Sequence, residues 1–377
     1  MKVLEIGMAW FPEQPGGMDR FYYNLVNKLP GAGVAVRGLV AGSERVLSDS
    51  GGFIRSFSPA KIPLSRRLFA VRKAMGNLLA EKKPDLVASH FALYTFPLLD
   101  RIRKFPLVIH FHGPWADEGA MEGGRGLAYK AKFRLEKTVY QQADRCIVHT
   151  RAFGRLLSEN YGVDVGRIRV VPSAVDASVF DLNVSKAEAR RRLGWPQDRP
   201  IVITVRRLVN RMGLENLIEA MLAVRREFPD ALLHIAGKGP LASMLEARIR
   251  SLGLENHVHL LGFVDDSDLP YVYRAADLSI VPSVALEGFG LTTLESLASG
   301  TPVLVTPVGG LPEAVGGLSS ALVLGGTGSH ALAEGLRAAL RGVLHLPDAK
   351  QCRRYVQENY NWPLIVRQVR SVYQEVL

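Results

Sequence analysis

The sequence has few cysteines and no long hydrophobic run, and each shortage narrows the class of protein. Cys146 and Cys352 are the only cysteines among 377 residues, and both lie within helix or strand patterns. We therefore expect buried free thiols rather than a disulfide or a cysteine metal site. No apolar run is long enough for a transmembrane helix, and the N-terminus leads directly into a strand pattern. The expected location is cytoplasmic, with no signal peptide.

Motifs of nucleic-acid and metal proteins are also missing. The sequence has no zinc-finger spacing, no RNA-binding aromatic run, no helix-turn-helix pattern and no His-Glu-x-x-His. The net charge is nevertheless +11 at pH 7. Residues 1–182 hold 26 lysines and arginines against 17 acids, whereas residues 183–377 hold 21 against 19. An anionic lipid surface or an acidic substrate therefore suits this chain better than nucleic acid.

Length and pattern indicate two α/β domains. A chain of 377 residues with 47% hydrophobic content can bury two cores. Strand and helix patterns alternate in two series, and the polar stretch Asp181–Arg199 separates them, so we expect a linker there. The predicted domains are residues 1–182 and 183–358. Residues 359–377 carry an apolar stripe typical of one more helix.

The patterns also predict individual elements. The predicted strands are 3–8, 34–40, 84–90, 106–111, 145–149, 200–205, 232–236, 258–261, 278–281 and 303–305. The predicted helices include 19–29, 64–80, 125–137 and 151–161, with later ones that start near 214, 240, 269 and 291. Asp19 and the stretch 265–267 suit helix N-caps.

The stretch from Pro282 to Gly309 carries the strongest functional pattern. A strand is followed by a loop with Glu287-Gly288-Phe289-Gly290, a helix pattern that starts at Leu291, and a second buried strand. Unpaired N–H groups at such a helix start attract anions, and glycines let a ligand lie against the backbone. Glu287 and Glu295 can accept hydrogen bonds from sugar hydroxyls. A phosphorylated sugar fits this pattern, although two acids at this spacing also suit a solvated helix start.

With Ala298-Ser299-Gly300-Thr301-Pro302-Val303 behind it, this stretch resembles the signature of retaining family 4 glycosyltransferases. The resemblance spans nearly the whole chain and is strongest at 282–303 and 204–213. It implies the GT-B fold: two Rossmann-like, doubly wound parallel-sheet domains with a cleft between them, and a C-terminal helix that crosses back to the first. It also implies a UDP-sugar donor in the second domain, an acceptor mainly in the first, and no metal or other cofactor.

The resemblance also implies roles for single residues. The donor-contact candidates are Gly16, Gly17, Arg207, Arg211, Val264, Glu287, Gly288, Phe289, Gly290, Leu291 and Glu295. The candidates for catalysis are His112, Arg207 and Glu287. In the family pattern, arginine side chains and helix-start amides hold the diphosphate, and His112 and Glu287 orient the sugar. Glu295 holds ribose hydroxyls, and the backbone of Val264 contacts the base.

Several positions leave alternatives open. Met212 stands where the family has lysine, so either Arg211 supplies that charge or the site holds one cation fewer. Ser173-Ala174 replaces the usual Asn-Gly, which weakens any ligand contact from that turn. Lys238 can face the nucleotide or solvent. Asp266 and Asp268 have the spacing of a metal-bound diphosphate site, but a helix N-cap accounts for this acidic stretch better.

We expect retaining transfer of a hexose, or a hexuronic acid, from a UDP-sugar to a glycan or lipid-linked acceptor in exopolysaccharide or cell-surface polysaccharide synthesis. A disaccharide phosphorylase-like relative and a non-catalytic UDP-sugar sensor remain as alternatives. The basic helices 64–80 and 125–137 are either solvated faces or contacts to anionic lipid at the inner face of the cell membrane.

Overall fold

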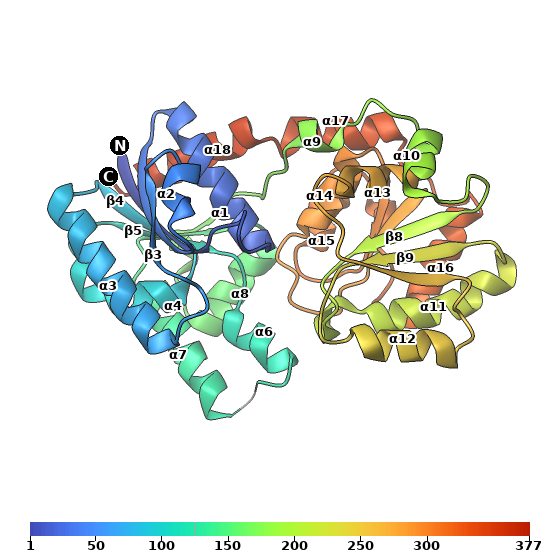
Figure 1. Ribbon diagram of the computed structural model, residues 1–377, viewed down its shortest axis with the longest axis horizontal. Helices are drawn as coiled ribbons and strands as arrows, with labels where there is room; N and C mark the ends of the chain where they lie inside the picture. The colour runs from blue at the N-terminus through green and yellow to red at the C-terminus, as the bar shows by residue number, and fades with distance from the viewer. Residues whose placement is uncertain (125) are drawn as a thin grey trace. The chain divides into compact units, whose positions relative to one another are not determined.

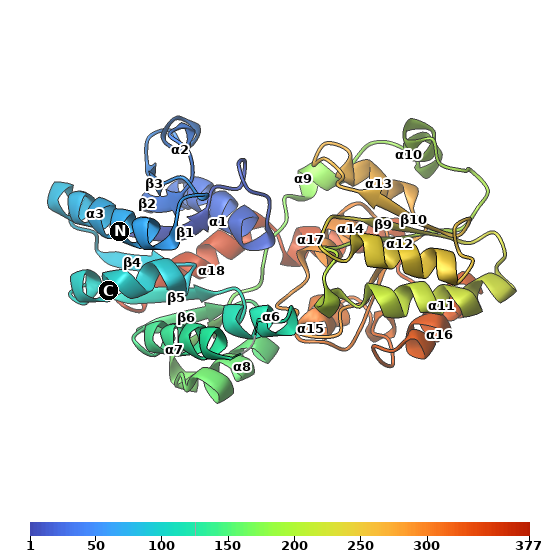
Figure 2. The same cartoon turned by 60° about the horizontal axis from the view of Figure 1, so that its bottom comes forward.

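The structure, a computed structural model, describes residues 1–124 and 126–377. The chain forms two compact units. The first unit consists of residues 1–173 and 362–377, and the second consists of residues 174–361. Within each unit, helices lie on both sides of a central sheet, and both chain termini belong to the first unit (Figures 1 and 2).

The first unit is built on seven parallel strands in the order β3-β2-β1-β4-β5-β6-β7. They are β1 (Lys2–Ala9), β2 (Ala35–Ala41), β3 (Ile54–Ser58), β4 (Leu86–Ser89), β5 (Leu107–Phe111), β6 (Arg145–Val148) and β7 (Ile168–Val170). Val3 of β1 pairs with Val36 on one side and Leu86 on the other. The strand order therefore reverses between β1 and β4, and ligands of such sheets bind beyond the carboxyl ends of strands at this switch point.

The helices of the first unit cover this sheet. They are α1 (Gly17–Lys28), α2 (Arg45–Asp49), α3 (Leu64–Glu81), α4 (Ala92–Thr95), α5 (Leu99–Ile102), α6 (Trp115–Met121), α7 (Leu127–Gln141), α8 (Arg151–Tyr161) and α18 (Trp362–Gln374). Short 3₁₀ turns lie at Leu29–Ala32, Phe96–Leu98 and Val165–Arg167. Helix α18 buries Ile365, Val369 and Tyr373, and the Tyr373 hydroxyl donates to Glu5 of β1 at 2.9 Å. The end of the chain thus completes the first unit.

The second unit repeats the plan with five parallel strands in the order β10-β9-β8-β11-β12. They are β8 (Ile201–Val205), β9 (Leu232–Ala236), β10 (Val258–Gly262), β11 (Leu278–Val281) and β12 (Val303–Val305). Four of the five residues of β8 are buried and so are all four of β11, as expected where helices cover both faces of a parallel sheet. The switch point lies between β8 and β11.

Nine helices of the described residues belong to the second unit. They are α9 (Ala177–Phe180), α10 (Lys186–Leu193), α11 (Leu214–Glu227), α12 (Ala242–Ser251), α13 (Leu269–Ala275), α14 (Leu291–Ala298), α15 (Leu311–Gly316), α16 (Ser329–Leu340) and α17 (Ala349–Asn359). Short 3₁₀ turns lie at Asn210–Met212 and Ser320–Leu322. Each unit has its own hydrophobic core. The prediction of two Rossmann-like parallel-sheet domains is confirmed.

The division between the units differs from the predicted boundary at 182/183. The chain joins the second unit at residue 174, because Val175 forms a parallel bridge with Asn361 and Phe180 is buried in the second core. Much of the predicted linker is helix α10, which begins with a capping box between Ser185 and Glu188. Its polar sequence is like that of a linker, but Lys186 and Arg190 form ion pairs with Asp277 of the same unit. The last helix starts at 362 rather than 359.

Two predicted helix caps are wrong. Gly16 is the N-cap of α1, whereas the Asp19 carboxylate accepts the N–H of Ala9 at 3.0 Å. Helix α13 has Asp268 at its N-cap, with no capping bond from that side chain. The helix predicted from residue 125 begins at Leu127, and Arg125 lies outside the described residues. The one predicted near 240 begins at Ala242.

Two predictions about composition can be compared with the structure. Cys146 and Cys352 are both buried and free, as predicted. Among residues 1–124 and 126–377, no helix has both the length and the apolar character that a membrane crossing requires.

Candidate active site

The loops that follow β8 and β11 meet at the switch point of the second unit. The N–H of Val284 donates to the carbonyl of Arg211 at 2.9 Å, which joins the two loops. Gly213 has a φ of +69°, and any Cβ at this position would collide with the carbonyl of Pro282. Only glycine therefore allows so close an approach of the two backbones. The junction fixes loop 206–213 against loop 282–290.

An ion pair between Arg206 and Glu287 lies where these loops meet. The two side chains are 5% and 12% exposed. The Arg206 guanidinium also donates to the hydroxyls of Ser283 and Thr292, the latter at 3.3 Å, and Ser283 donates to Glu287 at 2.9 Å. Among the described residues the Nε atom of Arg206 has no hydrogen-bond partner. The site thus holds a buried arginine with donor capacity to spare.

The charge of Glu287 follows from these neighbours. Burial raises the pKa of its carboxyl group, but the charge and hydrogen bond of Arg206 outweigh that effect, and Arg211 adds to it. The pKa of Glu287 therefore lies below its ordinary value. The side chain is a carboxylate at neutral pH and can act only as a hydrogen-bond acceptor.

Arg211 holds the same loop in an unusual shape. Its side chain is buried and donates to the carbonyl of Leu286 at 3.0 Å. Leu286 has a φ of +51° and is the single non-glycine residue with positive φ in the described part of the chain. Such backbone is strained for leucine and persists where surrounding contacts require it, often at functional sites. The strain lies immediately before Glu287.

Helix α14 starts directly after this loop. Its N-cap, Gly290, has a φ of +76°, and a Cβ there would approach the Leu311 side chain to 2.6 Å. Within residues 1–124 and 126–377, the backbone N–H groups of Leu291 and Thr292 have no protein acceptor. They stand at the positive end of the helix dipole. A diphosphate oxygen is a suitable acceptor for such groups.

The predicted residues of the first unit lie at the carboxyl edge of its sheet. Gly16 caps α1 and Gly17 is its first residue. His112 follows β5, and both of its ring nitrogens are engaged: Nε2 with Nδ1 of His90 at 2.9 Å, and Nδ1 with Nε2 of His149 at 3.1 Å. The sequence predicts that this imidazole binds a sugar hydroxyl. In the structure, a ring nitrogen could do so only if one of these two hydrogen bonds broke.

Comparison with known proteins identifies the class of enzyme. Residues 15–179 match the family described as Glycosyltransferase Family 4, and residues 185–362 match Glycosyl transferases group 1. The D-inositol 3-phosphate glycosyltransferase of Corynebacterium glutamicum strain R is 30% identical over 100% of this chain and 97% of its own length. This chain belongs to the glycosyltransferase family. The predicted GT-B type is confirmed by these matches and by the two parallel-sheet units.

Two further relatives show how far the likeness extends. Mannosylfructose-phosphate synthase of Agrobacterium fabrum is 34% identical over 50% of this glycosyltransferase and 43% of its own length, so the chain spans less than half of that relative. The crystal structure of Anabaena Alr3699/HepE in complex with UDP-glucose is 22% identical, with a TM-score of 0.81 and 100% of each chain covered. At that identity the structural likeness shows the fold alone.

Several predicted donor residues of the glycosyltransferase lie apart from the ion pair. Arg207 is exposed, next to buried Arg206. Phe289 is 5% exposed and packs edge-on against Tyr360 with ring centroids 5.4 Å apart, so its side chain belongs to the core. Glu295 is 6% exposed and accepts the Tyr273 hydroxyl at 3.1 Å. The ligand contacts of all three stay predictions.

The loops after β9 and β10 also lie together. The N–H of Gly237 donates to the carbonyl of Gly262 at 2.7 Å, and the Lys238 ammonium lies 5.2 Å from the centroid of the exposed Phe263 ring. Val264, the predicted base contact, is half-buried in the same loop pair. No metal-binding group of three or more His, Cys, Asp or Glu side chains occurs in the described part of the chain.

Sequence analysis did not name Arg206, which the structure places against Glu287. The resemblance pointed to Arg207 instead. Both faces of β8 are buried, with Val202 and Thr204 on one and Ile201 and Ile203 on the other, so the strand period does not distinguish the two arginines. An arginine on a buried face needs a partner, and Glu287 is the nearby acid that the motif already named.

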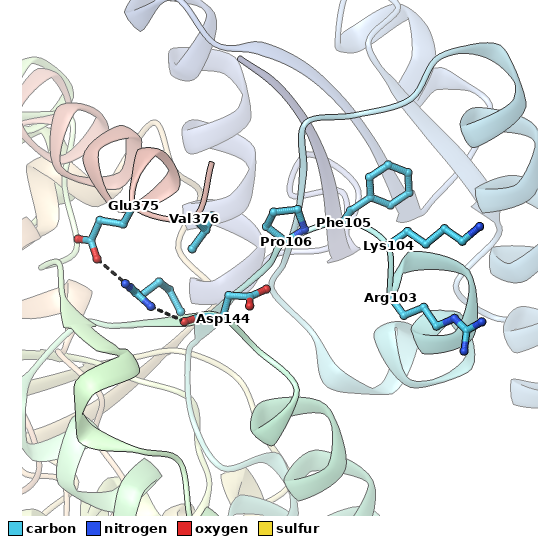
Figure 3. A pocket seen from close by; sticks show the side chains of 8 residues that line it. Arg103, Lys104, Phe105, Pro106, Asp144, Glu375 and Val376 are labelled. Atoms are coloured by element: carbon cyan, nitrogen blue, oxygen red, sulfur yellow. Dashed lines mark hydrogen bonds and ion pairs between the residues drawn. The ribbon is translucent and has the colours of Figure 1, made fainter.

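One hollow of the first unit lies away from these residues. About 370 Å³ in volume, it is lined by Phe105 and Pro106 before β5, by Asp144 and Arg145 at the start of β6, and by Glu375 (Figure 3). Arg145 donates to Glu375 at 2.8 Å. Because these residues mark the amino ends of the strands, the hollow lies at the opposite edge of the sheet from His112. It is not part of the candidate site.

Proposed function

We propose that this glycosyltransferase moves a hexose, or a hexuronic acid, from a UDP-sugar to a glycan or lipid-linked acceptor with retention of anomeric configuration. The observation that carries the proposal is Glu287, held as a carboxylate by Arg206 and Arg211 at the start of α14. This arrangement combines an acceptor for sugar hydroxyls with donors for a diphosphate. Nucleotide-bound neighbours, such as HepE with UDP-glucose, support the donor class.

The proposed chemistry depends on stabilising the leaving group. As the bond from the sugar C1 to the diphosphate breaks, negative charge grows on the diphosphate oxygens. The N–H groups of Leu291 and Thr292 and the cation of Arg207 take up that charge, while Arg206 holds Glu287 in place. A preformed site of this kind needs little reorganisation when charge develops. It answers the charge with arginines and backbone amides, without requiring a metal.

Retention follows, in this proposal, from attack on the same face. The acceptor oxygen bonds to C1 on the side from which the diphosphate leaves, and its proton passes to a diphosphate oxygen. Glu287 binds hydroxyls of the transferred sugar, Glu295 binds the ribose, and the backbone of Val264 contacts the base. Gly16 and Gly17, at the N-terminus of α1, are further predicted contacts of the diphosphate.

A lipid-linked acceptor is supported by one surface of the first unit. On α3, Phe69 is 72% exposed, and it lines a hollow together with Arg72, Lys73 and Arg101. Because Arg72 forms an ion pair with Asp100, Lys73 and Arg101 contribute most of the positive charge. An exposed aromatic ring among cations is typical of contact with anionic headgroups. We propose polysaccharide assembly at the inner face of the cell membrane as the setting. Co-sedimentation with vesicles tests this: binding should require anionic lipid and weaken in Phe69→Ser.

The test of the main proposal is turnover of a panel of nucleotide sugars with detection of the released nucleotide. UDP release from at least one UDP-sugar, stimulated by a glycan or lipid-linked acceptor, is expected. Retention is read from the anomeric configuration of the product by NMR. Dependence on inorganic phosphate would instead indicate a phosphorylase-like relative. Ligand-induced stabilisation without any turnover would indicate a sensor.

A matched pair of variants localises the activity. Glu287→Gln keeps the shape of the side chain but removes its charge, and it should lower turnover at least a hundredfold. Glu313→Gln changes another acid of the same unit, in the first turn of α15, and serves as the control. Full activity in Glu287→Gln would overturn the assignment of the site.

A further inference from the structure

Four histidines gather at the carboxyl edge of the first unit's sheet. His90 follows β4, His110 and His112 belong to the end of β5, and His149 follows β6. The rings of His90 and His110 stack with their centroids 4.1 Å apart. Glu5, a fully buried acid in the middle of β1, lies next to this cluster. Sequence analysis gave a role only to His112 among these residues, so the remainder of the cluster needs its own explanation.

A continuous chain of hydrogen bonds runs through the cluster. Nδ1 of His149 lies 3.1 Å from the carbonyl of Val171, and Nε2 of His149 lies 3.1 Å from Nδ1 of His112. Nε2 of His112 lies 2.9 Å from Nδ1 of His90. Nε2 of His90 lies 3.2 Å from Oε2 of Glu5. One residue within β1 and four residues that directly follow β4, β5, β6 and β7 are thereby linked in series.

The chemistry of the two ends sets the direction of this chain. The carbonyl of Val171 can only accept, so Nδ1 of His149 must donate to it. A neutral histidine has one N–H, which makes Nε2 of His149 an acceptor from Nδ1 of His112. By the same reasoning, Nε2 of His112 accepts from Nδ1 of His90. Nε2 of His90 is then left as an acceptor. Among the described residues, the hydrogen-bond partner of this nitrogen is Oε2 of Glu5, which must carry a proton when His90 is neutral.

The second oxygen of Glu5 agrees with this assignment. Oε1 accepts the Tyr373 hydroxyl at 2.9 Å, and that hydroxyl oxygen lies 2.7 Å from Nε2 of His110. Since the Tyr373 proton goes to Glu5, Nε2 of His110 must donate to Tyr373. Nδ1 of His110 then carries no proton, and it has no partner among the described residues.

We propose that Glu5 is a neutral acid at physiological pH and a positioning residue for His112, because its proton directs the hydrogen bonds that fix the tautomer and orientation of that ring. The link to catalysis rests on the proposed function and on the prediction from the family resemblance that His112 lies beside the transferred sugar. The tautomer assignment does not rest on it. Loss of the Glu5 proton would leave Nε2 of His90 without a donor. Each tautomer would then have to reverse, and a bare Nδ1 of His149 would face the Val171 carbonyl.

The groups around the cluster favour neutral forms. Burial lowers the pKa of His90 to about 3 and that of His149 to about 4, and it raises the pKa of Glu5 to about 8. The titratable groups that face Glu5 are His90 after β4, Tyr373 on α18, Tyr22 on α1 and, through Tyr373, His110 on β5. Within residues 1–124 and 126–377, its only ion-pair partner is His90. A carboxylate here would lack a lysine or arginine.

The test is histidine tautomer assignment by long-range ¹H–¹⁵N NMR on the full chain labelled with ¹⁵N-histidine. We expect His90, His112 and His149 as neutral Nδ1–H tautomers at pH 7 and His110 as neutral Nε2–H. Raising the pH past about 8 should shift the His90 and His112 signals together. A cationic His90, or an Nε2–H tautomer at His90 or His112 at pH 7, would overturn the proposal.

Two variants sharpen the result. Glu5→Gln can donate to His90 and accept from Tyr373, so it should keep the tautomers of pH 7 and lose the alkaline transition. Tyr373→Phe removes a donor that favours the ionised acid, so the transition should move to higher pH. If the alkaline transition persists in Glu5→Gln, Glu5 is not its source and the proposal fails. A failed donor assay with the expected tautomers would instead refute only the proposed function.

Discussion

Each unit of this glycosyltransferase buries a glutamate beside its switch point, and the pKa values of the two glutamates are shifted in opposite directions. Glu5 is surrounded by histidine and tyrosine, and burial raises its pKa to about 8. Glu287 is opposed by Arg206 and Arg211, which outweigh the effect of burial and hold its pKa below the ordinary value. The comparison shows that the partners of a buried acid, rather than its burial, decide whether it is charged.

The difference suits different tasks. The cluster of the first unit is a series of hydrogen bonds between buried groups, without a lysine or arginine in it. The charged pair of the second unit lies beside unpaired helix amides, which favours a diphosphate and its sugar. Similar sheets can therefore carry unlike chemistry at corresponding edges.

The largest expected effect comes from breaking the charged pair. Glu287→Gln leaves the buried Arg206 without its counter-ion and should destabilise the second unit by about 3–5 kcal/mol. Urea-induced unfolding of the full chain measures this. Arg206→Met in the same background removes the uncompensated charge, so the double variant should regain much of the lost stability while turnover stays low. A double variant no more stable than Glu287→Gln would contradict the ion pair.

The sequence predicted the fold in which the two glutamates lie, but not the residues that surround them. Two parallel-sheet domains and the loop before α14 could be predicted from the strand runs, the helix periods and the Glu287–Val303 signature. The choice between adjacent Arg206 and Arg207 depends on how the loop after β8 packs against loop 282–290, and a motif match does not contain that information.

The first-unit cluster was harder to foresee for a different reason. His90, His112 and His149 come from three strands that are distant in sequence, and only the register of the sheet brings them together. Glu5 looks like an alternating strand residue in isolation. Its partner Tyr373 lies 368 positions away along the chain, in a helix whose docking no local pattern specifies.

A smaller effect on stability is expected from Glu5. Between the ordinary pKa of 4.5 and the folded value of about 8, the unfolded chain loses the Glu5 proton while the folded chain keeps it. Stability should therefore fall as the pH rises through this range. Glu5→Gln removes this loss, and its Tm should exceed that of the wild type by roughly 5 °C at pH 8.

The acid side of the same profile provides the control. His90 and His149, with folded pKa values of about 3 and about 4, remain neutral when the unfolded chain is protonated below its ordinary 6.5. Stability should thus fall as the pH drops from 6.5 in both proteins. Thermal unfolding from pH 5 to 9 checks both limbs. Parallel curves for Glu5→Gln and the wild type above pH 6 would contradict a protonated Glu5.

The smallest effect on stability is expected for a substitution of Arg207. This substitution tests the charged site most directly. Because Arg207 is exposed, Arg207→Gln should change the free energy of unfolding by less than about 0.5 kcal/mol. If its cation meets the diphosphate, kcat/KM for the donor should still fall about tenfold, the usual scale for one charged hydrogen bond. Arg206→Gln should lose both stability and turnover, since it also releases Glu287. Unchanged kcat/KM in Arg207→Gln would mean that the buried pair and the α14 amides bind the diphosphate without this arginine. The binding groups of the second unit would then all be buried or part of the backbone.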